Sequence, residues 1–232
     1  MEHKKIVVLD ELRAACPAFV GAAVYAELVN TEYSSELWVD IENFVRKYRE
    51  CYDVSSIKQM PSIEATRLAY RKCGKDPSRY RPSGEALVRR VLQGKELYHV
   101  DTAVDLVNLA SIAYGYSIGG FDYDKIVGST LELGVGCEGE PYEGIGRGML
   151  NICGMPVYRD SVGGIGTPTS DNERTKMSLS TTRILALVNG YDGNRENVRA
   201  CALYIQDLLR KYAMSDGGEI VEFGCMPIVG ER

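Results

Sequence analysis

The sequence predicts an α+β protein, because helical patterns dominate the first half of the chain and strand patterns the second half. Apolar positions recur three and four residues apart over residues 30–52, which is typical of a surface helix. After Asp124 the segments become short, β-rich and separated by glycines, which indicates strands joined by tight turns. A last helix is expected over residues 197–214. This segregated order favours α+β over alternating βαβ units.

The helices of the first half begin and end at recognisable residues. A proline begins the segment 61–74 and a glycine ends it, which is the usual punctuation of a helix. Ser83 is placed to cap a helix over residues 85–94. Residues 102–105, Thr-Ala-Val-Asp, match a helix-start pattern and are expected to open a helix over residues 103–114.

Five segments are predicted to form strands. The N-terminal segment 4–9 has too short an apolar run for a signal peptide, and charged residues follow it at once. Three further strands are expected within residues 129–135, 151–163 and 181–190. The tail, residues 219–229, is expected to add an edge strand.

The composition is that of an ordinary globular protein, with 45% apolar and 25% charged residues. No apolar run is long enough for a transmembrane helix, so the chain is expected to be cytoplasmic and not to enter a membrane. The seven cysteines are scattered and never form a Cys-x-x-Cys pair, which argues against a disulfide framework or a zinc site. We therefore expect no metal and no cofactor.

The net charge of −5 means that any binding of RNA must come from a local basic patch. The densest basic stretch contains Arg79, Arg81, Arg89 and Arg90, with Tyr80 among them. These arginines are the candidates for contact with RNA phosphates, and the tyrosine is a candidate for stacking on a base. The alternative is a solvated helix face.

A polar strip on the helix over residues 103–114 runs into a glycine-rich segment. Asn108 and Ser111 are three residues apart, so we expect them to share one helix face. The chain is then expected to turn through Ile118-Gly119-Gly120 before it reaches Asp122. Bare backbone beside a few fixed polar groups is typical of a ligand pocket, whereas packing and a turn are the simpler alternative.

Two further glycine-rich runs were weighed as sites. Residues 134–139 match Gly-x-Gly-x-x-Gly, but neighbouring glutamates and a proline disfavour a dinucleotide site and predict a turn. Ser170-Asp171 follow the run Gly163-Gly164-Ile165-Gly166-Thr167-Pro168-Thr169, a flexible loop that turns into a polar cluster and forms either a pocket wall or a hairpin connection.

The ordered series of motifs from about residue 85 to 190 resembles the tRNA-editing domain of the bacterial-type phenylalanyl-tRNA synthetase beta subunit. The matching residues are, in chain order, Asn108, Phe121-Asp122, Gly139-Glu140, Pro156 to Asp160, Gly163 to Gly166 with Ser170, and Thr181 to Leu185. No single motif is specific, but their order and approximate spacing agree with that family.

The resemblance implies a barrel-like β core layered against helices, in a three-layer ββα arrangement. It implies a single domain over residues 1–232, in which a helical part of about 1–95 is integrated with an editing-like core of about 96–232. It also implies a pocket that accepts the aminoacyl end of mischarged tRNA and hydrolyses its ester with a positioned water. The expected partners are tRNA and an amino-acid-like small molecule. The candidate pocket residues are Asn108, Ser111, Gly119, Asp122, Thr167 and Ser170.

The sequence departs from the family at two polar positions. The family's histidine falls on Gly119, and its glutamate falls within the apolar run Ala186 to Val188. Loss of one well-placed hydrogen-bonding group commonly costs on the order of 10²-fold in rate. Either the activity is weak, or groups such as His99 or Asp122 have taken over, or the protein binds without cleaving. Nothing in the chain resembles an aminoacylation core, so we do not expect it to charge tRNA by itself.

The sequence thus leaves three functions open. The first is a hydrolase that edits mischarged aminoacyl-tRNA in trans. The second is a non-catalytic binder of an aminoacyl group or a free amino acid. The third is an interaction module of an RNA-processing assembly, with a vestigial pocket.

Overall fold

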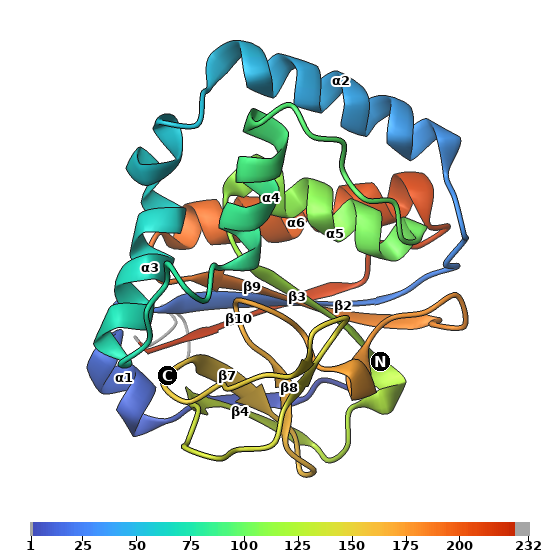
Figure 1. Cartoon of the computed structure of the whole chain (residues 1–232). Coiled ribbons are helices and arrows are strands. Elements are labelled where there is room, and N and C mark those ends of the chain that lie inside the picture. The colour runs from blue at the N-terminus through green and yellow to red at the C-terminus, as the bar shows by residue number, and fades with distance from the viewer. Residues whose placement is uncertain (1, 226–232) are drawn as a thin grey trace.

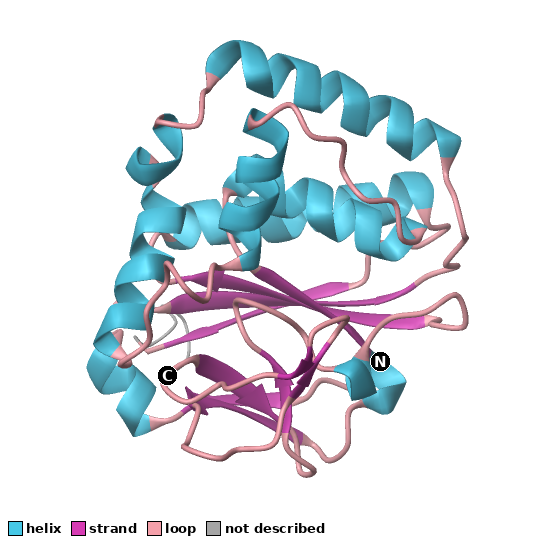
Figure 2. Cartoon of the chain, viewed as in Figure 1, coloured by secondary structure: helices cyan, strands magenta, loops and turns pink. Residues whose placement is uncertain are grey.

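The chain folds into three layers in the computed structural model, which describes residues 2–225. Helices form one outer layer, a four-stranded sheet lies in the middle, and a second four-stranded sheet forms the other outer layer (Figures 1 and 2). The middle sheet is therefore covered on both faces, and this burial decides which residues its strands carry.

The regular elements confirm the predicted α+β class. The α-helices are α1 (Asp10–Ala15), α2 (Ser35–Cys51), α3 (Pro61–Lys72), α4 (Ser83–Leu92), α5 (Thr102–Tyr114) and α6 (Arg195–Tyr212). The strands are β1 (Lys5–Val8), β2 (Val20–Glu27), β3 (Ile118–Asp122), β4 (Thr130–Val135), β5 (Glu143–Gly144), β6 (Gly148–Met149), β7 (Pro156–Arg159), β8 (Gly164–Gly166), β9 (Arg183–Gly190) and β10 (Glu219–Gly224).

The middle sheet has the antiparallel order β10-β2-β9-β3, and its centre is the long pairing of β2 with β9. Along β2, Ala22 and Val24 pack into the core beneath the helices, whereas Ala23 and Tyr25 pack into the core between the sheets. This alternation is the period of two expected for a strand with two buried faces. Because both sets are apolar, the strand has no polar face to mark it in the sequence.

The second sheet has the order β1-β4-β7-β8, with β1 parallel to β4 and the other pairs antiparallel. Leu131 and Leu133 of β4 and Ile165 of β8 are fully buried in the core between the sheets, against Phe121 of β3. Strands β5 and β6 form a separate hairpin.

The predicted barrel-like core is wrong. Both four-stranded sheets are open, and within residues 2–225 no strand ladder joins one to the other. The middle sheet ends at β10 and β3, and the second sheet ends at β1 and β8. A barrel needs a continuous ladder that returns to its first strand, whereas here the two sheets are joined by side-chain packing and by side-chain hydrogen bonds such as that from Tyr158 of β7 to Asn189 of β9.

Several element predictions are confirmed, and others need correction. The predicted helices over 30–52, 61–74, 103–114 and 197–214 correspond to α2, α3, α5 and α6, and the five predicted strands correspond to β1, β4, β7, β9 and β10. Residues 226–229 of the last predicted strand lie outside the described residues. Strand β2 was missed, because its two apolar faces give no alternation of polar and apolar residues.

Three local predictions were wrong. Residues 118–120, predicted as a turn, belong to the edge strand β3. Ser83 is the first residue of α4 and makes no capping hydrogen bond. Asp101, not Thr102, caps α5, because its carboxylate accepts a hydrogen bond from the backbone N–H of Val104.

None of the helices that the structure describes could span a bilayer, because none combines the necessary length with sufficient hydrophobicity.

A buried carboxylate joins α3 to α4. Glu85 of α4 is only 2% exposed and lies 2.8 Å from Arg67 of α3, 3.0 Å from Arg89 and 3.5 Å from Arg81. A buried charge that loses its partner is strongly destabilising, and here one carboxylate serves three guanidinium groups.

We therefore expect Glu85→Gln to lower the free energy of unfolding by about 3 kcal/mol, because it leaves the arginines without their counter-charge. Urea denaturation measures this loss. Glu64→Gln, which alters an exposed carboxylate on α3, serves as the control and should change stability by less than about 0.5 kcal/mol. Equal stability of the two variants would contradict this account of the helix pair.

Candidate functional site

A cavity of about 560 Å³ lies between α5, the edge strand β3 and the segment 176–179. Its lining is mostly apolar, with a few polar groups that face inward. The lining side chains that the site uses are Val104, Val107, Asn108, Ile118, Asp171 and Leu179. This combination of apolar walls and a few fixed polar groups is typical of a small-molecule site.

Helix α5 presents Asn108 to the cavity. Val104 and Asn108 are four residues apart, so they lie on the same face of α5 and line the cavity together. The helix ends at Gly115, which adopts a left-handed conformation with φ of 70°. Asn108 is half-buried, and no side-chain hydrogen bond joins its amide to another described residue. That amide is free to bind a ligand.

Ser111 and Asp105 do not share the cavity with Asn108. The hydroxyl of Ser111 donates to the carbonyl of Tyr116 and so stabilises the end of α5. The carboxylate of Asp105 points to the other side of the helix, where it accepts hydrogen bonds at 2.7 Å from the ring nitrogens of Trp38 and His99. Of the predicted polar strip, only Asn108 lines the cavity.

Asp171 is the strongest candidate for chemistry in this cavity. Strand β3 is an edge strand, so the backbone N–H of Gly120 is free of the ladder and donates to Asp171 Oδ2 at 3.1 Å. Protein atoms surround the carboxyl group and no cation pairs with it among the described residues, so burial raises the pKa of Asp171 to about 7. A half-buried carboxyl group that titrates near neutral pH is suited to act as a general base.

Gly119 and Gly166 lie beside Asp171, and their lack of a side chain makes room above all for the ring of Phe121. A Cβ atom on Gly119 would lie 3.4 Å from Asp171 Oδ1, and one on Gly166 would lie 3.1 Å from it. Either Cβ would also lie within 2.7 Å of the ring of Phe121. Gly119 was predicted as a pocket residue, but it does not line the cavity. Its role is to leave space, because it has no side chain.

Thr167 and Ser170 form the turn that presents Asp171. The Thr167 hydroxyl oxygen accepts from the backbone N–H groups of Thr169 and Ser170, and it donates to the Ser170 carbonyl at 3.0 Å. The Tyr142 hydroxyl donates to the same carbonyl at 2.7 Å. These bonds position the residue that follows the turn, and neither Thr167 nor Ser170 lines the cavity.

Asp122 is buried at the end of β3, and its side chain is fully used in the structure. It accepts from the Thr181 hydroxyl at 2.9 Å and from the backbone N–H of Asp124 at 3.1 Å, and it lies 3.2 Å from Lys125 Nζ. This network joins the end of β3 to the residues before β9. It does not reach the cavity.

The four arginines predicted for RNA contact have different surroundings. Arg81 and Arg89 are held by Glu85, as described above. Arg79 is exposed, and the guanidinium of Arg90 lies 3.7 Å from the centre of the Tyr98 ring. Arg79 and Arg90 form no ion pair with another described residue, so they remain the more available of the four.

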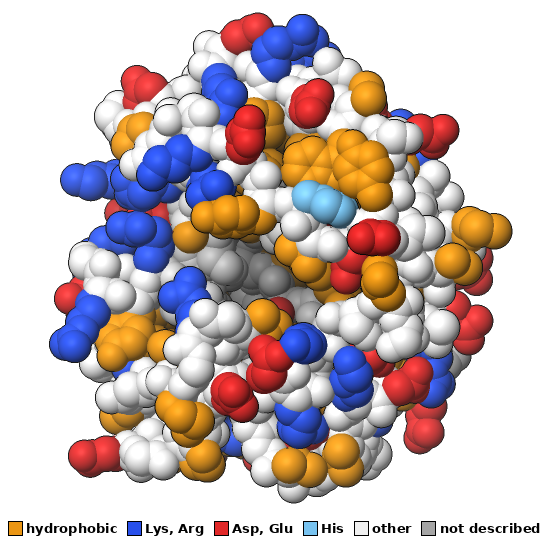
Figure 3. Space-filling model, turned by 45° about the vertical axis from the view of Figure 1, so that its right-hand side comes forward, with side chains coloured by type: hydrophobic (Ala, Val, Ile, Leu, Met, Phe, Trp, Pro, Cys, Tyr) orange, Lys and Arg blue, Asp and Glu red, His pale blue; other side chains and the backbone are white. Residues whose placement is uncertain are grey.

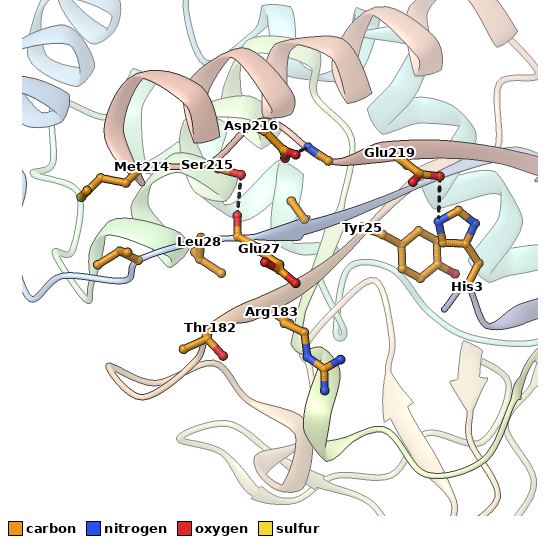
Figure 4. Close-up of a pocket in the computed structure, with 13 residues that line it drawn as sticks. His3, Tyr25, Glu27, Leu28, Thr182, Arg183, Met214, Ser215, Asp216 and Glu219 are labelled. Atoms are coloured by element: carbon orange, nitrogen blue, oxygen red, sulfur yellow. Dashed lines mark hydrogen bonds and ion pairs between the residues drawn. The ribbon is translucent and has the colours of Figure 1, made fainter. Parts of the chain in front are cut away.

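A second and larger cavity, of about 740 Å³, lies near the ends of β2, β9 and β10 (Figure 4). Several of its polar side chains already have partners: His3 Nε2 lies 3.2 Å from the Glu219 carboxylate, and the Ser215 hydroxyl donates to the backbone carbonyl of Glu27. Arg183 pairs with Asp124. None of the predicted pocket residues lines this cavity, so we place the candidate site at Asp171 and Asn108.

Within residues 2–225, no cluster of three His, Cys, Asp or Glu side chains is arranged to hold a metal ion.

The sequence offered only a weak signal for Asp171. It follows the glycine-rich run and the turn residues Thr167 and Ser170, which marks it as part of a polar cluster. Its importance depends on contact with Gly120, which lies far away in the chain. A pattern of residues cannot reveal that contact.

An α+β fold with a mostly apolar cavity at a sheet edge thus defines the class of this protein, and comparison with known proteins identifies the family. The model of the B3/4 domain matches residues 65–211, which is more than half of the chain, so the chain belongs to the B3/4 domain family. This confirms the resemblance to the synthetase beta subunit inferred from the sequence.

One solved structure that is similar to this chain is an N-terminal fragment of the phenylalanyl-tRNA synthetase beta subunit from Pyrococcus horikoshii. The TM-score is 0.49 at 13% sequence identity, and the similarity covers 97% of this chain and 55% of the fragment. The chain thus spans about half the length of that fragment. A search of curated proteins found no match.

The raised pKa of Asp171 makes stability depend on pH. The native state binds a proton on Asp171 up to about pH 7, whereas the unfolded state releases it near the ordinary value of 3.8, so stability falls as the pH rises between the two. We expect Asp171→Asn to raise the free energy of unfolding by on the order of 2 kcal/mol at about pH 8 and by little at about pH 4. Thermal denaturation at both pH values measures the difference.

Glu138→Gln, which alters an exposed carboxylate on the loop after β4, is the control and should show no such pH dependence. A destabilising effect of Asp171→Asn at the higher pH would mean that the native state favours the ionised carboxylate, contrary to this reading.

Proposed function

We propose that this protein hydrolyses the ester bond of mischarged aminoacyl-tRNA in trans, with Asp171 as the general base. The observation that carries this proposal is a carboxylate without an ion pair and with a pKa of about 7, on the wall of a cavity that the free amide of Asn108 also lines. The membership of the chain in the B3/4 domain family supports the same class of substrate.

In the proposed reaction a water molecule in the cavity attacks the carbonyl carbon of the ester, and Asp171 takes the proton that the water loses. The amide N–H of Asn108 donates a hydrogen bond to the oxygen that becomes negative. When the tetrahedral intermediate collapses, the ribose oxygen leaves and takes the proton back from Asp171. The products are a free amino acid and an uncharged tRNA.

The position of Asp171 supports its part in this reaction. The resemblance places the family's histidine at residue 119, which is glycine here, and Asp171 Oδ1 lies 3.4 Å from where a Cβ on that glycine would be. A carboxylate from another segment thus lies beside the position of the missing side chain. His99 bonds to Asp105 on the other side of α5, and Asp122 is held by Thr181, so neither is placed for this role.

The cavity walls favour an apolar or aromatic amino acid. Val104, Val107, Ile118 and Leu179 contribute most of the apolar lining, and the volume of about 560 Å³ is within the range of small-molecule sites. We therefore expect tRNAs that carry apolar or aromatic amino acids to be the best substrates among those tested.

A deacylation assay on a panel of mischarged tRNAs tests the proposal. We expect wild-type protein to release the amino acid, and Asp171→Asn and Asn108→Ala each to lower the rate by on the order of 10²-fold. Because only the ionised carboxylate can accept a proton, the wild-type rate should rise with pH and level off above about pH 7.

Glu138→Gln should keep the wild-type rate, since its carboxylate lies on an exposed loop. No release from any tRNA in the panel would reject the hydrolase. If calorimetry then showed heat with free tyrosine or phenylalanine that Asn108→Ala abolished, the same cavity would serve binding alone.

A further inference from the structure

Three aromatic rings form a cluster on the surface beside the cavity, and we call Tyr33, Trp38 and His99 the aromatic platform. The ring of His99 meets those of Tyr33 and Trp38 edge-on, at centroid distances of 5.1 and 5.7 Å. Tyr33 is 55% exposed, although aromatic rings are usually placed where they can be buried. Figure 3 shows a face on which hydrophobic side chains gather around a histidine above a hollow.

Buried hydrogen bonds hold the platform in place. The carboxylate of Asp105, which is almost fully buried, accepts 2.7 Å hydrogen bonds from Trp38 Nε1 and His99 Nδ1. The backbone N–H of Val100 donates to the same carboxylate at 3.1 Å. These bonds fix Trp38 and His99, and Tyr33 packs against both rings. Rings that are already held in place lose little conformational freedom when a ligand covers them.

Free cations lie next to the rings. The platform borders a groove of about 470 Å³, which Arg46, Arg49 and Lys95 also line. Among the described residues, none of these three cations forms an ion pair. Arg49 donates instead to the carbonyls of Val91 and Lys95. Glu42 and Glu96 also line the groove, so the cations outnumber the carboxylates on a chain whose net charge is negative.

The groove and the cavity share a rim. Glu32 lines the cavity and its neighbour Tyr33 lines the groove, while Val100 lines the cavity and its neighbour His99 lines the groove. The two rim segments are bonded together, since the backbone N–H of Thr102 donates to the carbonyl of Thr31 at 3.0 Å. A ligand in the cavity can therefore extend directly onto the platform.

We propose that the aromatic platform binds the unpaired 3′-terminal nucleotides of an RNA, with a base against Tyr33 and phosphates near Arg46 and Lys95. This inference rests on the proposed function for the identity of the group in the cavity, which would be the aminoacyl ester at the end of the same strand. Aromatic faces beside unpaired cations are the combination that holds single-stranded nucleic acid, because every base has a face that can stack. A duplex hides those faces, so it does not fit this surface.

The chain offers a direct probe of this surface, because Trp38 is its only tryptophan. The probe ligand is a short, uncharged single-stranded RNA that ends in cytidine-cytidine-adenosine. We expect it to change the fluorescence of Trp38, and Tyr33→Ala to weaken its binding by roughly 5- to 150-fold. Tyr52→Ala removes an exposed tyrosine at the far end of α2, so it is the matched control and should leave binding unchanged.

A second pair of variants tests the phosphate contacts. Arg46→Gln should weaken binding and reduce the slope of log K against log salt concentration by about 0.7, the value for one lost contact with a single strand. Lys47→Gln changes the next residue of α2, which is exposed and does not line the groove, so it should leave the slope unchanged.

The outcomes separate this inference from the proposed function. If Tyr33→Ala and Arg46→Gln bind the RNA as wild type does while wild-type protein still deacylates aminoacyl-tRNA, the platform is rejected and the hydrolase stands. If the RNA binds as expected but no tRNA is deacylated, the platform stands and the hydrolase is rejected. Equal binding of a blunt duplex, with no response of Trp38, would also overturn the platform.

Discussion

The burial of both faces of the middle sheet constrains the rest of this structure. Strands β2 and β9 pack against helices on one side and against the second sheet on the other, so their side chains are almost all apolar. A polar group on either strand is buried and needs a protein partner, as Asn189 of β9 has in Tyr158 and Ser117. The candidate site lies instead at the edge strand β3. The backbone N–H of Gly120 in β3 is not used in the sheet ladder. It donates a hydrogen bond to the carboxylate of Asp171 and so holds that group at the edge of an otherwise apolar sheet.

A carboxylate without a counter-charge at this position lowers stability, but it suits the proposed function. A carboxylate with only one hydrogen bond and no cation costs free energy when it ionises, and the native state tolerates it because the turn before Asp171 is held by Thr167 and Tyr142. The same burial that costs free energy raises the pKa of Asp171, and this makes the carboxylate suited to act as a base near neutral pH. Glu85 shows the contrast, since this more deeply buried carboxylate has three arginines around it and serves structure.

Helix α5 serves both the cavity and the aromatic platform. Asn108 lines the cavity, and Asp105, three residues earlier, bonds to two rings of the platform. Residues three apart on a helix differ in direction by about 60°. Over the width of a helix that angle is enough to send two polar side chains to different sites. The spacing of polar residues along α5 therefore could not tell which of them act together.

The sequence alone determined the α+β class, most helices, and the family. These follow from local signals, such as the apolar period of α2, Pro61 at the start of α3, and the ordered motifs that begin at Asn108. It also singled out Asn108, which lines the cavity, and Gly119, which does not. It missed β2, because a strand with two apolar faces shows no alternation, and it predicted a barrel where there are two open sheets.

Only the tertiary structure decided which polar groups meet. Asp171 matters through its contact with Gly120, and Tyr33 and His99 matter through theirs with each other. In both cases the partners come from segments that are distant in the chain and that only folding brings together.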